Sequence, residues 1–234
     1  MGIRSSGAYL GGRSGIYPVG GGGTPPFAFG NALKFDGVND YVSCSNIALT
    51  TISTLSFWFN ISDADRDGTI FANSADSNTA YRILSSTQIR IVSGGVSDFT
   101  VPTIVTGTWY HCLIAIGATN TRLYLNGVES TTGALPNRLV TINQLGKYYL
   151  SSGAFNLNGL LDEVAVWSGT HEGTLIDAQN LYNSGNGALA SDVIASPTAY
   201  WRMNESGTDT TAVDEQGTYD GTLNNFSGTY WVAH

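Results

Sequence analysis

Charged side chains are scarce in this sequence. Asp, Glu, Lys and Arg together make up 12% of the 234 residues, against about 25% in an ordinary soluble domain. Only ten Lys and Arg residues are present, scattered along the chain, and the formal net charge is −8. Nucleic-acid binding relies on clustered cations that release counterions, so the composition argues against nucleic acid as a partner. Acidic loops could instead hold a cation such as calcium.

Cysteines and long apolar runs are also few. The two cysteines, Cys44 and Cys112, lie in apolar stretches, which favours two buried thiols but leaves a disulfide open. No stretch reaches the ~18 apolar residues of a membrane span. Residues 1–6 lack the apolar core of a signal peptide. We therefore expect neither a membrane partner nor a secretion signal.

Residues 1–30 differ in composition from the rest of the chain. Clustered glycines and the pair Pro25-Pro26 interrupt this segment, which follows neither a helical nor an alternating period. It cannot bury enough surface alone to offset the entropy lost on ordering, yet it is richer in apolar residues than a plain linker. Two interpretations stay open: a disordered leader, or an extended arm that orders against a neighbouring subunit.

Residues 31–234 have the pattern of one all-β domain. Short segments of alternating apolar and polar residues are separated by turn residues, as in β-sandwiches. Asn126-Gly127 predicts a tight hairpin turn, and residues 173–183 carry the only amphipathic helical pattern. The predicted strands flank a turn at 35–41 and span residues 54–61, 79–84, 88–93, 109–116, 121–125, 128–131, 139–145 and 157–167.

Five strand segments form an ordered series, namely 33–42 (LKFDGVNDYV), 55–59 (LSFWF), 109–114 (WYHCLI), 123–127 (LYLNG) and 159–167 (GLLDEVAVW). In this order and spacing they resemble the laminin-G-like, concanavalin A-like lectin and glucanase family. The resemblance implies an antiparallel jelly-roll sandwich of two sheets with one short helix. It implies no single function, because this sandwich serves as lectin, glycanase scaffold, adhesion module and virion component.

The C-terminal residues 198–234 look like the opening phrase of many members of this family, although here they follow the predicted helix. They could close the chain's own sandwich in a permuted order, which their short length favours, or donate a strand to a neighbour. The same segment resembles tails of marine bacteriophage structural proteins that carry this domain.

An acidic turn is the first candidate calcium site. Asp63, Asp65 and Asp67 form a D-x-D-x-D-G string of the kind found in EF-hand loops. The twelfth position is Ser74 rather than the bidentate glutamate, and a strand rather than a helix precedes the turn. The alternative is structural, since aspartates in such turns cap backbone amides.

A second candidate calcium site combines Asp36, Asn39 and Asp40 with Asp162. Here the family resemblance is the guide, because laminin-G-like domains often carry calcium near loops at one edge of the sandwich. Asp162 is followed by Glu163, and neighbouring residues of a strand point to opposite faces. The alternative is again structural: the first three residues build a turn and Asp162 satisfies a buried amide.

The sequence does not indicate a catalytic site. Retaining glycosidases need two carboxyl groups close together, and the E-x-D-x-x-E string of related jelly-roll glucanases is absent. The histidines His111, His171 and His234 match no zinc-binding spacing, and no G-x-S-x-G elbow occurs. We expect a protein that is not an enzyme.

Carbohydrate binding would need exposed aromatic rings beside polar donors and acceptors. Trp58 and Trp109 match positions that the family buries. The aromatic residues not obviously absorbed by the core are Tyr148, Tyr149, Trp167, Tyr230 and Trp231. For each of them the alternative is burial under a loop.

Two functions are compatible with these features. The favoured hypothesis is a structural protein at the surface of a bacteriophage virion, such as a capsid decoration or a head or tail fibre subunit. It would assemble with other virion proteins, and with copies of itself, through the arm of residues 1–30. The alternative is a lectin module that binds a surface glycan or receptor, with or without calcium.

Overall fold

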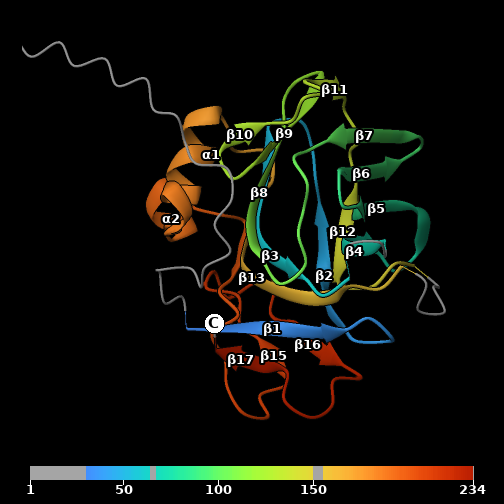
Figure 1. The fold of residues 1–234 in the computed structure, drawn as a ribbon, viewed down its shortest axis with the longest axis vertical. Coiled ribbons are helices and arrows are strands. Elements are labelled where there is room, and N and C mark those ends of the chain that lie inside the picture. Colours follow the sequence, from blue (N-terminus) through green and yellow to red (C-terminus); the bar gives the residue numbers. More distant parts are fainter. Residues whose placement is uncertain (1–29, 64–66, 150–154, 234) are drawn as a thin grey trace, which may run out of the picture.

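Two antiparallel β-sheets face each other in the computed structural model, which describes residues 30–63, 67–149 and 155–233. Figure 1 shows the two layers side by side. The all-β sandwich expected from the sequence is confirmed. The first sheet, sheet A, has the order β10-β9-β8-β3-β13-β1-β17, with β11 beside β9 and β14 beside β13. Its strands are β1 (Asn31–Asp36), β3 (Ser53–Ile61), β8 (Trp109–Ile116), β9 (Asn120–Leu125), β10 (Val128–Glu129), β11 (Leu135–Pro136), β13 (Asn158–Trp167), β14 (Ala199–Trp201) and β17 (Trp231–Ala233).

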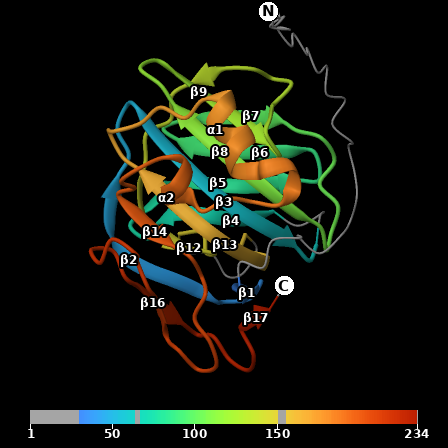
Figure 2. The ribbon, with the colours of Figure 1, turned by 90° about the vertical axis from the view of Figure 1, so that its left-hand side faces the viewer.

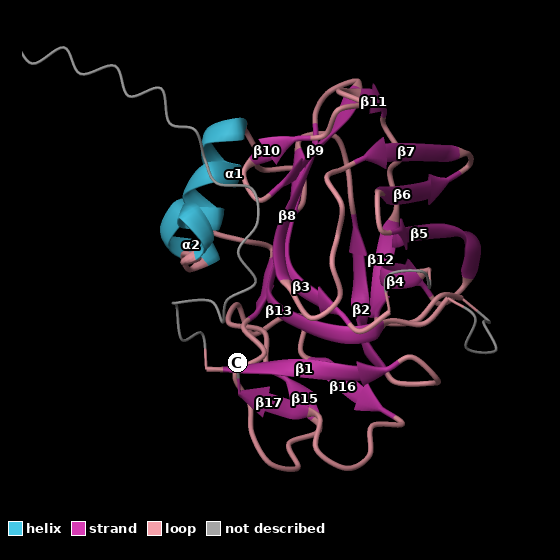
Figure 3. Cartoon of the chain, in the orientation of Figure 1, coloured by secondary structure: helices cyan, strands magenta, loops and turns pink. Residues whose placement is uncertain are grey.

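The second sheet, sheet B, has the order β15-β16-β2-β12-β4-β5-β6-β7. Neighbouring strands in both sheets pair antiparallel, and the colouring in Figure 3 shows how fully strands dominate the fold. The strands of sheet B are β2 (Tyr41–Ala48), β4 (Gly68–Asn73), β5 (Asp76–Ser85), β6 (Gln88–Ser93), β7 (Val96–Thr100), β12 (Thr141–Leu145), β15 (Thr211–Ala212) and β16 (Gly221–Asn224).

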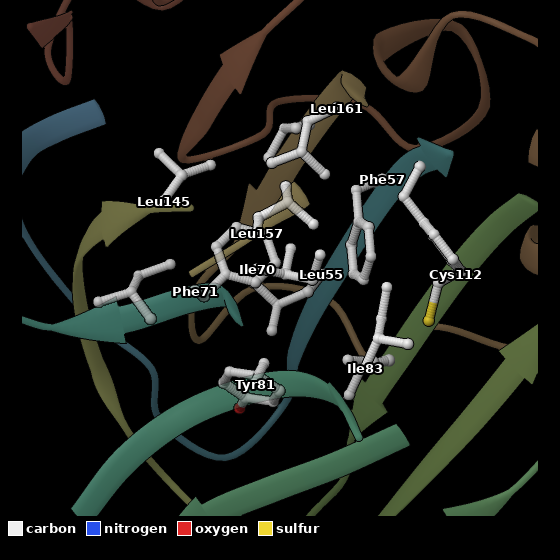
Figure 4. Close-up of a cluster of buried hydrophobic side chains, with 14 of the residues drawn as sticks. Leu55, Phe57, Ile70, Phe71, Tyr81, Ile83, Cys112, Leu145, Leu157 and Leu161 are labelled. Atoms are coloured by element: carbon white, nitrogen blue, oxygen red, sulfur yellow. The ribbon is translucent and has the colours of Figure 1, made fainter. Parts of the chain in front are cut away.

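The main hydrophobic core fills the space between the sheets. Phe57 of sheet A meets Phe71 of sheet B edge to face, with ring centroids 5.4 Å apart, and Tyr81 packs at right angles to Phe71. Cys112 is fully buried in the same cluster (Figure 4). Burial of large side chains at this density is the dominant stabilising term of such a sandwich.

A helical layer covers the outer face of sheet A (Figure 2). It comprises α1 (Leu175–Tyr182), a 3₁₀ turn (Asn183–Gly185) and α2 (Ala190–Val193). Leu181 and Ala178 of α1 pack with Leu113, Tyr124 and Trp167 of the sheet in a second apolar cluster. Within the described residues, no helix has the length and apolar content needed to cross a lipid bilayer.

The predicted helix is confirmed, and its boundary has a clear cause. Thr174 accepts a hydrogen bond from the amide of Asp177, whose carboxylate accepts one in return from the amide of Thr174. This capping box satisfies two amides that the first helical turn leaves unpaired. At the other end Asn183 adopts a left-handed conformation and stops the helix.

Most predicted strands are confirmed, and the hairpin at Asn126-Gly127 has the two positive φ angles, 51° and 73°, that its turn type requires. Strands β4 and β7 were missed. The first five residues of β4 are all buried, so no alternation marks it. In β7 an inward-facing serine, Ser97, replaces the apolar residue that the pattern would need.

Residues 198–234 add strands to both sheets of the same chain. Strand β14 pairs with β13 and β17 pairs with β1, while β16 pairs with β2. The side chain of Asn204 accepts a hydrogen bond from the amide of Asn31 at 3.1 Å. The C-terminal segment therefore pairs with strands of its own chain, including the first two strands, β1 and β2.

Candidate functional site

A pocket of about 380 Å³ opens on sheet B. Its walls come from β2, from β12 and from the loops that follow β4 and β12. Sheet A carries the helical layer on its outer face, so the pocket lies on the other side of the sandwich. The lining residues are Tyr41, Ser43, Cys44, Ser74, Asn143, Gln144, Lys147 and Tyr149.

Strand alternation explains why polar residues gather here. Val42 points into the core, so its neighbours Tyr41 and Ser43 point to the outer face of the sheet. The register places Gln144 of β12 directly opposite Ser43, and a bulge follows Ile142. The pairing of β2 with β12 thus assembles a polar wall from two segments about a hundred residues apart.

Interlocked amide groups hold the floor of the pocket in place. The side-chain oxygen of Asn143 accepts from the amide of Ser74 at 2.8 Å, and its nitrogen donates to the side chains of Asn46 and Ser74 at 3.0 Å. The side-chain nitrogen of Gln144 donates to the carbonyl oxygen of Lys147 at 2.9 Å. These bonds fix both amides and the start of the loop after β12.

Three polar groups of the lining take no part in these hydrogen bonds and are called the uncommitted groups here: the ammonium group of Lys147 and the hydroxyl groups of Tyr41 and Tyr149. The ammonium nitrogen of Lys147 lies 4.5 Å from the centroid of the Tyr41 ring, a cation–π distance. It forms no ion pair with any described carboxylate. Within the described part of the chain, the hydroxyl groups of Tyr41 and Tyr149 have no hydrogen-bond partner either. A ligand would meet two tyrosine edges and one cation.

The thiol of Cys44 also lines the pocket, but its reactivity is low. Burial, with a smaller contribution from the charge of Asp214, raises its pKa to about 12. A thiol with such a pKa is protonated at neutral pH and reacts slowly, because the thiolate is the reactive form. Both cysteines are free, Cys112 fully buried and Cys44 partly so, which confirms two separate thiols.

The loop that carries the pocket's lysine and tyrosine is anchored by Arg82. Its guanidinium lies 4.4 Å from the Phe155 ring centroid and 5.1 Å from that of Tyr148. The same group pairs with both carboxylate oxygens of Asp67, with Nε donating at 2.8 Å. Tyr148 is therefore part of a packed stack, whereas the next residue, Tyr149, faces the pocket.

Three aromatic residues predicted as sugar platforms are not exposed. Trp167 is 0% exposed beneath the helical layer, where its indole donates to the carbonyl of Ile194. Tyr230 and Trp231 are 7% and 5% exposed and pack against each other and against Phe226. For these three rings burial, the alternative to a sugar platform, is what the structure shows, because tertiary packing covers them.

The acidic turn at residues 63–67 is only partly described. Asp63 and Asp67 lie inside the described residues, and Asp65 lies outside them. Asp67 is held by Arg82. A calcium ion at this turn would have to compete with a guanidinium for that carboxylate, so this residue does not fit a calcium ligand.

The second predicted calcium group is not assembled. The carboxylate of Asp36 accepts from the amides of Val38 and Asn39 at 2.7 and 3.1 Å, so it builds its own turn. Asp162 lies on β13, four residues beyond the partner of Asp36 in the sheet, or about 13 Å away along the strand. Among the described residues, no three His, Cys, Asp or Glu side chains converge as a metal site.

Asp40 of this turn is nevertheless unusual. One of its oxygens accepts a hydrogen bond from the amide of Asp36 at 3.0 Å, while the other is buried and has no hydrogen-bond partner among the described residues. Burial and the nearby charge of Asp36 raise the pKa of Asp40 to about 6. This carboxylate accepts protons more readily than an ordinary one.

Asp162 and Glu163 of β13 do not point to opposite faces of the sheet as neighbouring residues of a regular strand do. Glu163 has a φ of 48°, and the register with β3 shifts between Asp162 and Ala165. Glu163 is consequently buried, accepting hydrogen bonds from Tyr200 and from Arg202. Burial raises its pKa to about 7. The cluster ties β14 to β13 and does not line the pocket.

Comparison with known proteins identifies the same kind of fold, a concanavalin A-like sandwich. A laminin G profile described as the concanavalin A-like lectin/glucanases superfamily matches residues 36–177. A candidate carbohydrate binding protein from Bacteroides ovatus superposes with a TM-score of 0.65 at 19% identity, covering 89% of this chain and 62% of that chain. A heptameric SAP-like pentraxin from Limulus polyphemus superposes with a TM-score of 0.50 at 14% identity, covering 65% of this chain and 82% of that chain.

At these identities the structural likeness concerns the fold alone. The chain spans less than two thirds of the Bacteroides protein, and no functionally curated protein matches the sequence. The profile, by contrast, covers more than half of the chain and, apart from residues 33–35, includes the ordered strand series described above. This chain therefore belongs to the concanavalin A-like lectin/glucanases superfamily.

Proposed function

We propose that the pocket on sheet B binds a carbohydrate without transforming it. The observation that carries the proposal is the set of uncommitted groups at Tyr41, Lys147 and Tyr149, held over a floor of fixed amides. A sugar ring presents an apolar face that packs on an aromatic ring and hydroxyl groups that both donate and accept. The pocket offers a partner to each.

The size of the pocket limits the ligand. Small-molecule sites measure about 300–1,000 Å³, and the 380 Å³ found here lies near the lower end of that range. The pocket therefore suits a short saccharide or the end of a longer glycan. The fold shared with a candidate carbohydrate binding protein supports the same ligand class.

The chemistry of the lining favours binding over catalysis. Among the described residues that line the pocket there is no carboxylate or imidazole, and the raised pKa of the Cys44 thiol keeps it protonated at neutral pH. His111 is fully buried, bonded to Ser56 at 2.9 Å, and burial lowers its pKa to about 3. Glu163 lies under α2 rather than in the pocket. General acid–base catalysis needs such groups within reach of the ligand.

The virion role expected from the sequence is compatible with glycan binding, because a domain displayed on a particle could do both. That role depends on residues 1–30, of which 1–29 lie outside the described residues. The pocket lies inside them. Glycan binding is therefore the function that the described geometry supports better.

Titration calorimetry after a glycan-array screen tests this proposal, with the full chain assayed in calcium and in EDTA. Tyr149→Ala should lose at least about tenfold in affinity, since stacking and one hydroxyl contact disappear. The matched control is Tyr182→Ala, which truncates a half-buried tyrosine of the helical layer. Equal affinities of the two folded variants and the wild type would disprove the assignment of this pocket.

A further inference from the structure

We infer that the pocket selects saccharides carrying an anionic group, a carboxylate or a sulfate; this inference builds on the proposed function. Lys147 is the only charged residue among the eight described residues that line the pocket. Its charge faces aromatic, amide, thiol and hydroxyl groups. A neutral sugar would leave this cation without a counter-charge.

Lys147 differs from most of the described cations in having no carboxylate partner, a property that it shares with Lys34 and Arg138. Four arginines pair with carboxylates, namely Arg82 with Asp67, Arg90 with Asp98, Arg122 with Glu129 and Arg202 with Glu163. Two of these pairs lie on sheet B itself, on neighbouring strands β5 and β6. Arg138, which also reaches this sheet, donates instead to the hydroxyl of Ser97 and to the carbonyl oxygens of Ser93 and Val96. Among the described residues, the ammonium group of Lys147 has neither kind of partner and contacts only the Tyr41 ring.

The position of Lys147 is fixed at both ends. Gln144 holds its carbonyl oxygen, and the ring of Tyr41 holds its ammonium group. A pre-positioned cation loses less entropy on meeting an anion than a mobile surface lysine does. The half-buried setting also lowers the local dielectric, which strengthens the interaction beyond its value in water.

The rest of the protein opposes anion binding, so any preference must be local. The net charge is −8, which repels anions at long range. Asp214 is the acid whose charge reaches the lining, at Cys44. Its oxygens accept backbone amides of Tyr200, Gln216, Thr218 and Tyr219, which compensate part of that charge.

Matched saccharides test the inference on the full chain. The probes are a neutral oligogalactose, the oligogalacturonate of the same length and a sulfated oligogalactose, titrated by calorimetry. We expect at least one acidic probe to bind about tenfold or more tighter than the neutral one. The uronate and sulfate arms show which anionic group the pocket prefers.

Three variants make the result specific to the pocket. Lys147→Met keeps the apolar stem of the side chain and removes its charge, so the ratio of acidic to neutral affinity should fall to about one. Lys147→Arg should keep the preference. Lys34→Met removes the same charge from an exposed position on β1 and should behave as the wild type.

The outcomes separate the two proposals. Neutral and acidic probes bound equally by the wild type would overturn anion selection and leave glycan binding intact. A preference that persists in folded Lys147→Met would also overturn it. If no saccharide of any class binds, the proposed function itself fails, and the inference fails with it.

Discussion

The guanidinium of Arg82 lies between the rings of Tyr148 and Phe155 while pairing with Asp67. One residue of β5 thus fixes both ends of the segment that leaves β12 and returns to β13. Tyr149 and the lysine of the pocket belong to that segment. The loop geometry at the pocket depends on a residue that does not line it.

Arg82→Met should therefore destabilise the fold and weaken glycan binding together. Leaving the carboxylate of Asp67 without its partner at a mostly buried site should cost about 2–4 kcal/mol of unfolding free energy. Arg90→Met removes a more exposed pair with Asp98 and should cost less than about 1 kcal/mol. Urea denaturation compares the two. Equal losses would show that Arg82 has no special role.

Cys44 should be a slow nucleophile although it lines the pocket. With its pKa raised from 9.0 to about 12, alkylation by iodoacetamide at neutral pH should be roughly 1,000-fold slower than for a free cysteine, because the thiolate fraction is smaller by about that factor. Cys112 should react more slowly still. Intact-mass spectrometry over time measures both.

The same experiment tests the state of the two thiols. After denaturation without reductant, the chain should take up two alkyl groups, since both cysteines are free. A chain that reacts only after reduction would carry a disulfide, contrary to the structure. Rapid alkylation of the folded chain would instead contradict the raised pKa.

Glu163 should make the fold less stable as the pH rises. Burial, with repulsion from Asp162, raises its pKa from 4.5 to about 7, while Tyr200 and Arg202 oppose the shift. Between these values the folded chain binds the proton more tightly than the unfolded chain. Its contribution to stability is therefore complete below pH 4.5 and is lost as the pH rises through 7.

Glu163→Gln stays neutral and should not show this loss. Relative to the wild type, the variant should gain about 3 kcal/mol of unfolding free energy between pH 4.5 and pH 8. Glu172→Gln, at an exposed position, serves as the control. Urea denaturation at several pH values gives the difference, and a difference that stays constant with pH would refute the prediction.

The fold was predictable because its signals are local. Alternation predicted most strands, Asn126-Gly127 predicted a hairpin, and an amphipathic pattern predicted α1. The hidden features come from tertiary structure. The sequence did not place Trp167 in the core, yet the helices pack over it and bury it. The bulge at Glu163 reverses the face that simple strand counting assigns.

The candidate site was mostly hidden for the same reason. Tyr149 was singled out from the sequence, whereas Tyr41, Asn143 and Lys147 were not. They lie in segments about a hundred residues apart, and only the register that sets Gln144 against Ser43 brings them together. Outward-facing polar residues on β2 and β12 were visible as a pattern, but the pattern cannot say that these strands are neighbours.

Residues 1–30 can be tested separately from the pocket, because the described fold begins at residue 30 and β1 pairs with β17 and β13 of the same chain. If these residues are an assembly arm, the full chain should form a defined oligomer and a chain of residues 30–234 should be a monomer. Light scattering measures both masses. Glycan affinity per chain should be the same in the two forms, since the pocket lies wholly within residues 41–149. Two monomers would remove the assembly role in free solution, and an affinity lost on truncation would show that residues 1–29 contribute to the site.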